Sequence, residues 1–295
     1  MHNDRTIFLT LVRTSAEKDY GRILIDSIRD FGGELSQCPI WLFEADPQNA
    51  SCTSLVDEQV KIFPLGVPDS VKGYFFASKV WACAQAEAMA SDVQSLIWID
   101  PVCLVIQPPL LFELDGAVDT AVRPVHIKNV GQLPEESPDS FWQKVYNVVG
   151  LADLRMTVET FVGKQQIRAY FNTHAFAVNP AKGLLHEWFT LFEQLVRDKD
   201  YQKAACPDQL HQIFLHQAIW SALLAARLPL ERVRILPPDY NYPYNLHQSV
   251  PPERRAAALN DLVCAAYEER SLDPQLMDDI AVQEPLRSWL AAQVR

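Results

Sequence analysis

Short apolar runs alternate with helical patterns along the first half of the chain. Runs at residues 7–12, 39–43, 60–65 and 96–99 have the length of strands, and residues 23–31 and 76–88 place apolar side chains at helical spacing between them. Strands that alternate with helices predict an α/β fold with a mainly parallel sheet and helical crossovers. Residues 13–19 are predicted to form a polar loop, and Gly32-Gly33 is expected to end the first helix.

The second half predicts a mixture of strands and helices. Ser137-Pro138 offers a helix a serine N-cap and a proline at its first position, and a polar segment then runs to Arg168. Strong helical patterns follow at residues 183–197 and 209–226. Further strands are expected at residues 118–125, 175–178, 233–236 and 262–266, and the acidic segment from residue 272 is helical at most.

The composition is that of a single globular domain. Of the 295 residues, 48% are hydrophobic and 21% are charged, as is ordinary for such a protein. The first half, to about residue 125, has the α/β pattern of a nucleotide-binding unit, and residues 271–295 form a helical extension. No apolar run approaches the ~18 residues of a membrane span, and no signal peptide precedes the first strand. A cytoplasmic protein is therefore expected.

Charge and residue usage narrow the classes of partner. The net charge of −11 comes without a basic stretch, which argues against nucleic acid and anionic membranes as partners. Neither the dinucleotide pattern G-x-G-x-x-G nor the P-loop pattern occurs. The six cysteines lack metal-ligand spacing, so scattered thiols in a reducing compartment are expected.

One carboxylate stands at the end of a strand that should be buried on both faces. The apolar run 96–99 ends at Asp100-Pro101. Open α/β sheets bind ligands at the carboxyl ends of their strands, so Asp100 is a candidate binding residue. An ordinary Asp-Pro turn is the alternative interpretation.

Three further segments place polar side chains where chemistry could use them. Asn172 and His174 share one side of the chain because strand side chains alternate; the alternatives are a turn cap for Asn172 and a core position for His174.

Gln217 projects from the apolar face of the predicted helix 209–226. An unpaired buried amide costs roughly 1–3 kcal/mol, so it needs backbone or substrate as a partner. The aromatic and amide side chains of residues 240–247 could bind a base or a sugar, or form an ordinary ordered loop.

Taken in order, these features resemble the nucleotide-diphospho-sugar transferases of the GT-A fold, in particular the bacterial glycosyltransferase-like proteins related to glycogenin and the galactosyltransferases. The resemblance covers roughly residues 7–267 and implies a nucleotide-binding half at about 1–125 and an acceptor and sugar half at about 126–270. It implies transfer of a sugar from a UDP- or GDP-type donor to an acceptor. The motifs that carry it are Trp98-Ile99-Asp100-Pro101-Val102, Phe171-Asn172-Thr173-His174, His216-Gln217-Ala218 and Leu236-Pro237 with Tyr240-Asn241.

The resemblance also implies roles for single residues. Asp100, His174 and Gln217 would form the catalytic set, and Asp100 would be the remaining carboxylate of an Asp-x-Asp motif that holds Mn²⁺ or Mg²⁺. Lys79 would face the diphosphate. The residues implied to bind the donor are Thr10, Val12, Arg13, Tyr20, Lys79, Asn172, Asn241 and Tyr242.

Two departures from the family pattern bear on the metal. Val102 replaces the second aspartate, and the late strand at residues 262–266 has no histidine ligand near it. Hard cations prefer several oxygen ligands, so metal affinity should be low unless Glu268 or Glu269, together with His174, rebuilds the site.

The same departures leave two functional classes open. A transferase without a metal would need Lys79, Arg13 and His174 to stabilise the leaving diphosphate, and Asp208 and Glu159 are available carboxylates for a general base. The other class is a degenerate member of the fold that binds a nucleotide, a sugar or a protein without turnover. An unrelated nucleotidyltransferase would need at least two carboxylates for its metals, so the missing second aspartate counts against it as well.

Overall fold

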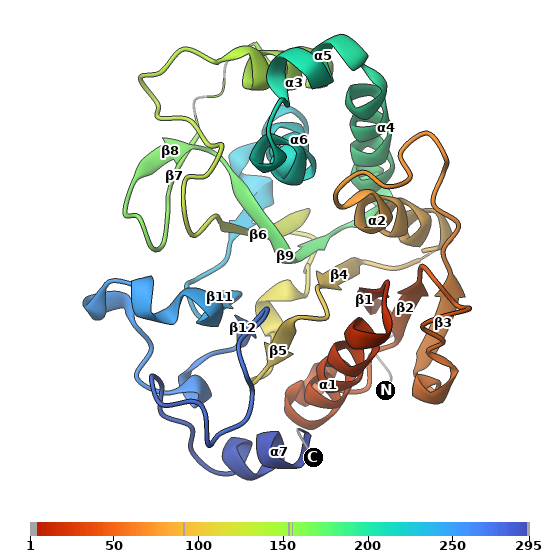
Figure 1. Ribbon diagram of the computed structural model, residues 1–295, viewed down its shortest axis with the longest axis vertical. Coiled ribbons are helices and arrows are strands. Elements are labelled where there is room, and N and C mark those ends of the chain that lie inside the picture. The colour runs from red at the N-terminus through yellow and green to blue at the C-terminus, as the bar shows by residue number, and fades with distance from the viewer. Residues whose placement is uncertain (1–4, 91, 153, 155, 294–295) are drawn as a thin grey trace.

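The computed structural model describes residues 5–90, 92–152, 154 and 156–293. Its largest sheet has seven strands in the spatial order β10-β6-β9-β4-β1-β2-β3 (Figure 1). β1 pairs in parallel with β2 and β4, β2 with β3, and β6 with β10, whereas β9 is antiparallel to both of its neighbours, β4 and β6. The prediction of a mainly parallel sheet is confirmed, with one antiparallel strand inside it.

The elements have the following bounds. The strands of the large sheet are β1 (Thr6–Val12), β2 (Ile40–Glu44), β3 (Val60–Pro64), β4 (Ser95–Ile99), β6 (Thr120–Pro124), β9 (Phe171–Val178) and β10 (Val233–Ile235). A small sheet has the order β11 (Tyr242–Pro243), β12 (Cys264–Ala266) and β5 (Cys103–Val105), and a hairpin joins β7 (Thr157–Glu159) and β8 (Gln166–Arg168). The α-helices are α1 (Ser15–Phe31), α2 (Ala77–Met89), α3 (Ser140–Val149), α4 (Leu184–Arg197), α5 (Lys199–Ala205), α6 (Gln209–Arg227) and α7 (Leu286–Gln293).

Helices cover both faces of the large sheet, which is why its central strands are buried and mostly apolar. Every residue of β1 and of β4 is buried. On one face, under α2, α4 and α6, the aromatic side chains of Trp98, Phe176 and Trp220 pack together, and α1 covers the other face (Figure 1). Because neither face is solvated, a polar group at this sheet is free to meet a ligand only at a strand end.

The C-terminal segment closes against the first helix. α7 lies beside α1 (Figure 1). The indole Nε1 of Trp289 donates to Asp30 Oδ2 at 2.6 Å, and the Trp289 ring packs edge-on against Phe31 with centroids 5.2 Å apart. The extension predicted to be helical at most is therefore irregular up to Leu286 and helical beyond it.

Two predicted helix starts were wrong. α1 begins at Ser15 within the predicted loop, because Thr14 is its N-cap and accepts a hydrogen bond from the Glu17 backbone N–H. α3 begins at Ser140 with Asp139 as its N-cap, not at Ser137-Pro138. Thr14, predicted to lie in a loop, and Asp139, predicted to lie within the helix, are thus the residues that cap the two helices. The polar segment before Arg168 also contains the β7–β8 hairpin, which was not predicted.

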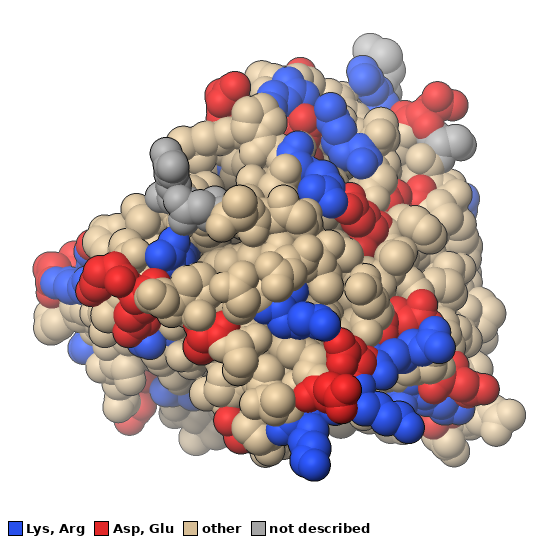
Figure 2. Space-filling view, turned by 90° about the horizontal axis from the view of Figure 1, so that it is seen from above, with Lys and Arg blue, Asp and Glu red and all other residues tan. Residues whose placement is uncertain are grey.

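The surface carries mixed charge. On the face shown in Figure 2, the described basic side chains lie next to acidic ones and do not form a continuous basic surface. Within the described part of the chain, no helix is long and apolar enough to cross a membrane.

Candidate functional site

A cleft of about 740 Å³ opens at the carboxyl ends of β4, the middle strand of the seven, and of its parallel neighbour β1. Its walls come from the start of α1, the start of α2, the end of β4 and the segment after β12. The cleft thus lies where an open α/β sheet binds its ligands. The charged and aromatic side chains that line it include Arg13, Tyr20, Lys79, Asp100, Glu268 and Glu269.

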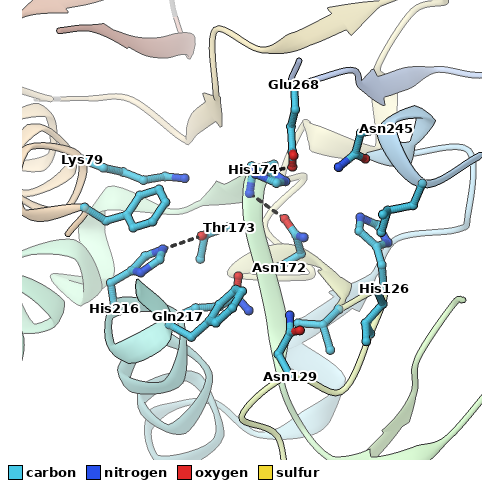
Figure 3. A pocket seen from close by; sticks show the side chains of 15 residues that line it. Lys79, His126, Asn129, Asn172, Thr173, His174, His216, Gln217, Asn245 and Glu268 are labelled. Atoms are coloured by element: carbon cyan, nitrogen blue, oxygen red, sulfur yellow. Dashed lines mark hydrogen bonds and ion pairs between the residues drawn. The ribbon is translucent and has the colours of Figure 1, made fainter. Parts of the chain in front are cut away.

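A second, smaller cavity of about 130 Å³ adjoins the cleft. The two share five lining residues, among them Lys79, His174 and Glu268, so they form one continuous site. Figure 3 shows Lys79 and His216 on one side of this cavity, His126 and Asn245 on the opposite side, and His174 between them. Besides the shared Lys79, His174 and Glu268, the polar side chains that line the smaller cavity are His126, Asn129, Asn172, Thr173, His216, Gln217 and Asn245.

Lys79 and Asp100 form a buried ion pair at the junction of the two cavities. Lys79 Nζ lies 2.7 Å from Asp100 Oδ2, with the lysine and aspartate side chains 3% and 11% exposed. The other oxygen of Asp100, Oδ1, accepts a hydrogen bond from Trp98 Nε1 at 2.7 Å. The ammonium also lies 5.4 Å from the Trp98 ring and 5.6 Å from the Phe76 ring. Both carboxylate oxygens of Asp100 therefore already have partners.

His174 joins the two cavities through its ring. Its Nε2 lies 3.9 Å from Asp100 Oδ2 and 3.6 Å from Glu268 Oε1, and its backbone carbonyl accepts a hydrogen bond from the Asp100 N–H. Burial lowers the pKa of His174, and the Lys79 ammonium lowers it further, against the opposing effect of the two carboxylates. The imidazole is therefore neutral at neutral pH.

Asn172 holds the backbone next to His174. Its side-chain Oδ1 accepts from the His174 backbone N–H at 2.7 Å and from Asn241 Nδ2 at 2.9 Å. Asn241 is fully buried and lines neither cavity. Asn172 and Asn241, each implied to bind the donor, thus contact one another, with Asn172 at the cavity and Asn241 behind it.

His216 and Gln217 enter the site from α6. His216 Nδ1 lies 2.8 Å from the Ile213 carbonyl, which can only accept, so this nitrogen carries the proton and Nε2 accepts from the Thr173 hydroxyl at 3.0 Å. The Phe76 ring stacks on this imidazole with centroids 4.2 Å apart. Burial lowers the pKa of His216 well below its usual range. Gln217, next along the helix, is buried and lines the smaller cavity.

His126 is buried against the smaller cavity with neither ring nitrogen hydrogen-bonded within the described part of the protein. Burial lowers the pKa of His126 well below its usual range, so the ring is neutral and offers one donor and one acceptor. Buried polar groups are nearly always hydrogen-bonded. Among the described residues, the ring of His126 therefore lacks hydrogen-bond partners that a polar ligand could supply.

Several lining residues have an uncommon backbone conformation. Phe76, Asn129 and Glu268 have φ of 60°, 46° and 49°, in the left-handed region that non-glycine residues seldom adopt. Such conformations cluster at active sites and ligand clamps. Three segments distant in sequence share this property at one site.

Some predicted binding residues do not reach either cavity. Thr10 and Val12 are buried in the sheet, whereas Leu11 between them lines the cleft, because side chains alternate along β1. Tyr242 is buried in the small sheet, and its hydroxyl pairs with His247 Nδ1 at 2.8 Å. The aromatic loop thus contributes core residues, and only its turn reaches the cavity, through Asn245 and Leu246.

The carboxylates suggested as general bases are also engaged elsewhere. Asp208 caps α6 and pairs with His211, and Glu159 pairs with Arg254; neither carboxylate lines a cavity. Of the predicted basic residues, Arg13 lines the cleft and is paired with Glu17. The site residues that the motifs did not single out include Phe76, His126, Asn129 and Phe214.

The residues at the end of β4 do not fit a divalent cation. Mg²⁺ and Mn²⁺ prefer several oxygen ligands. Val102 lines the cleft at the position of the motif's second carboxylate, and the Lys79 ammonium group forms an ion pair with Asp100. In the described ranges, no group of three or more histidine, cysteine, aspartate or glutamate side chains is arranged to hold a metal ion.

Comparison with known proteins identifies the fold. The chain is similar over 99% of its length to the apo structure of the bifunctional glycosyltransferase WbbM, with a TM-score of 0.58 and 15% identity, and it spans 52% of that chain. It is also similar over 97% of its length to the galactosyltransferase LgtC in complex with donor and acceptor sugar analogues, of which it covers 95%, with a TM-score of 0.53 and 12% identity. An active-site glutamine-to-glutamate mutant of LgtC gives a TM-score of 0.51. No protein-family model and no curated protein sequence matches the chain.

The class of fold follows from these similarities. The central sheet, its helical layers and the cleft at the strand ends form the GT-A fold of nucleotide-sugar glycosyltransferases. The resemblance drawn from the sequence motifs is therefore confirmed at the level of the fold.

Proposed function

We propose that this protein is a glycosyltransferase that transfers a sugar from a nucleotide-diphosphate donor to an acceptor hydroxyl. The observation that carries the proposal is the continuous site in which a buried cation, Lys79, lies between a large cleft and a small polar cavity. A nucleotide-sugar has the same three parts in the same order, with a diphosphate between a large nucleoside and a smaller sugar.

Each part of the site suits one part of the donor. The larger cleft, with Arg13 and Tyr20 in its wall, has room for the nucleoside. The smaller cavity, of about 130 Å³, continues from the cleft through their five shared lining residues, so a sugar bound in it can extend into the cleft. Its wall offers amides from Asn129 and Gln217 and the unpaired imidazole of His126, which can exchange hydrogen bonds with sugar hydroxyls.

The transfer step requires charge and proton handling that these residues can supply. The bond between the sugar C1 and the phosphate oxygen breaks, its electron pair leaves with the diphosphate, and the acceptor oxygen bonds to C1 and loses its proton. A fixed cation at the leaving oxygens stabilises the charge that develops there, and Lys79 is placed for this. The neutral imidazole of His174 has the lone pair that a departing proton needs.

The similar structures support the same assignment. LgtC is described as a galactosyltransferase that binds donor and acceptor sugar analogues, and an active-site glutamine of LgtC has been changed to glutamate. Gln217 is a buried glutamine in the smaller cavity of this protein.

The test combines binding and turnover. Calorimetry with uridine, guanosine and deoxythymidine diphosphates, each with and without Mn²⁺, should detect binding of at least one nucleotide, and hydrolysis of the matching nucleotide-sugar should be measurable. Gln217→Ala should lower hydrolysis more than tenfold and leave nucleotide affinity within about threefold. Gln194→Ala is the matched control, because Gln194 is exposed on α4.

Two outcomes would contradict the proposal. Binding without any turnover would indicate a module that holds a nucleotide or sugar without transferring it. The absence of binding to every nucleotide, with and without Mn²⁺, would remove the nucleotide-sugar donor altogether.

A further inference from the structure

We propose that this site binds the donor diphosphate without a divalent cation, because the Lys79 ammonium, held by Asp100, takes the place and the role of the metal. The inference rests on the proposed function, since it specifies how the nucleotide-sugar is held. It departs from the Asp-x-Asp motif of the fold, in which carboxylates hold Mn²⁺ or Mg²⁺ against the diphosphate.

The strand-end carboxylate is already neutralised. Lys79 Nζ and Asp100 Oδ2 are 2.7 Å apart, and Asp100 Oδ1 holds the Trp98 indole N–H. A cation that bound to Asp100 would lie beside an ammonium group in a partly desolvated site, where like charges repel strongly. A metal would have to displace Lys79 from its partner.

Lys79 has no room to withdraw. Its side chain is 3% exposed, in the first turn of α2, whose neighbouring positions Ala77 and Val80 are core residues. The rings of Phe76 and Trp98 both lie within 6 Å of the ammonium. A desolvated ammonium between aromatic rings is held both by its ion pair and by the ring electrons. The cation is therefore a permanent part of the site.

Asp100, His174 and Glu268 lie near one another at the site, although they are not arranged to hold a metal ion. His174 Nε2 lies 3.9 Å from Asp100 Oδ2 and 3.6 Å from Glu268 Oε1. The Asp100 oxygen in this arrangement is the one that pairs with Lys79, and the Glu268 side chain is 40% exposed. The Lys79 ammonium thus competes directly with a metal at this position, and Val102 adds no ligand.

Lys79 can supply the electrostatic part of the reaction. When the bond between the sugar C1 and the phosphate oxygen breaks, the electron pair moves onto the diphosphate, and a positive charge fixed beside that oxygen lowers the energy of the charged state. An ammonium carries one positive charge and three N–H donors. One donor is used by Asp100, which leaves two that phosphate oxygens could accept.

The test uses the full-length protein and compares each nucleoside diphosphate in EDTA and in Mn²⁺ or Mg²⁺. For a nucleotide that binds, we expect dissociation constants within threefold of each other in the two conditions, and donor hydrolysis that EDTA does not abolish. Binding that is lost in EDTA and restored by Mn²⁺ would overturn the inference while leaving the proposed function intact. If no nucleotide binds in any condition, it is the proposed function that fails.

A pair of variants tests the role of the lysine directly. Lys79→Met is made together with Asp100→Asn, so that no buried charge is left unpaired, and is compared with Asp100→Asn alone. Loss of one charge-assisted contact to phosphate should weaken nucleotide binding by about 10- to 100-fold. Lys61→Met, at an exposed position of β3, is the control and should bind as the wild type does. Equal affinity of the double and the single variant would overturn the inference, and the EDTA comparison decides the question independently if a variant does not fold.

Discussion

The buried Lys79–Asp100 pair makes a sharp prediction about stability, separate from any role in binding. Lys79→Met removes the ammonium and leaves a carboxylate that is 11% exposed without its counter-charge. Removing one partner of a buried ion pair typically costs about 3–5 kcal/mol, because the remaining charge stays desolvated. Asp100 keeps its hydrogen bond from the Trp98 indole, so we expect the lower end, about 3 kcal/mol.

The double variant Lys79→Met/Asp100→Asn should recover most of that loss. It leaves no charge at the end of β4, and the asparagine oxygen can still accept from the Trp98 indole. Replacement of a buried pair by uncharged groups is often close to neutral. We therefore expect the double variant within about 1 kcal/mol of the wild type, which makes the two single substitutions strongly non-additive with a coupling energy of about 2 kcal/mol or more.

The assay is denaturant unfolding of the four proteins at pH 7, followed by circular dichroism. In thermal unfolding, a loss of 3 kcal/mol would lower the melting temperature of a protein of about 150–250 residues by about 6–12 °C. Lys144→Met is the matched control. Lys144 pairs with Asp198 at 2.8 Å, but its side chain is 40% exposed, and exposed ion pairs contribute little to stability.

Additive effects of Lys79→Met and Asp100→Asn on the free energy of unfolding would contradict this prediction. If Lys79→Met and Asp100→Asn each cost less than about 1 kcal/mol and their effects simply add, the pair behaves as an exposed one. The charge at the site would then be solvated, contrary to the burial of both side chains. A double variant less stable than Lys79→Met alone would point instead to a packing role for the aspartate.

Three further predictions concern acid stability, metal binding and the C-terminal helix. Burial lowers the pKa of His126 and of His216 below the value in the unfolded chain. The free energy of unfolding should therefore decrease as the pH falls below about 6.5, by about 1.4 kcal/mol per pH unit for each residue. His216→Gln should reduce this pH dependence in urea unfolding, and an unchanged pH dependence would exclude the effect. Val102→Asp combined with Lys79→Met supplies a second carboxylate to the cleft and frees Asp100, and should create Mn²⁺ binding measurable by calorimetry; no heat above that of the wild type would contradict this. Trp289→Ala removes the contact with Phe31 and should make the C-terminus sensitive to limited proteolysis while nucleotide affinity stays unchanged; equal resistance would show that α7 is held by other contacts.

The order of strands and helices could be predicted because burial on both faces leaves a clear pattern. β1 and β4 are buried along their whole length and mostly apolar, and the helices between them repeat apolar residues every three or four positions. The direction of β9 could not be predicted in the same way. A strand buried on both faces has the same composition whether its neighbours run parallel or antiparallel to it, so the local sequence carries no signal for its direction.

The sequence identified single residues of the candidate site better than it identified which residues contact one another there. Asp100 and His174 were predicted separately, and the structure places them across one strand pair, with the Asp100 N–H bonded to the His174 carbonyl. His126 gave no such signal. It follows β6 in an irregular segment, and its place at the small cavity depends on how that segment is arranged in three dimensions.

Asp100 shows why a strand-end carboxylate does not by itself define a metal site. The residue that sets the charge around it lies 21 positions earlier, in the first turn of α2, and reaches Asp100 only because β4 and that helix meet at the cleft. A lone aspartate there would attract a cation from solution. With Lys79 at 2.7 Å, its charge is already balanced within the protein, and the cleft presents an ammonium group to an anionic ligand instead of a carboxylate pair to a metal. The same strand end can thus hold a diphosphate by either chemistry, and Val102 together with Lys79 favours the ammonium.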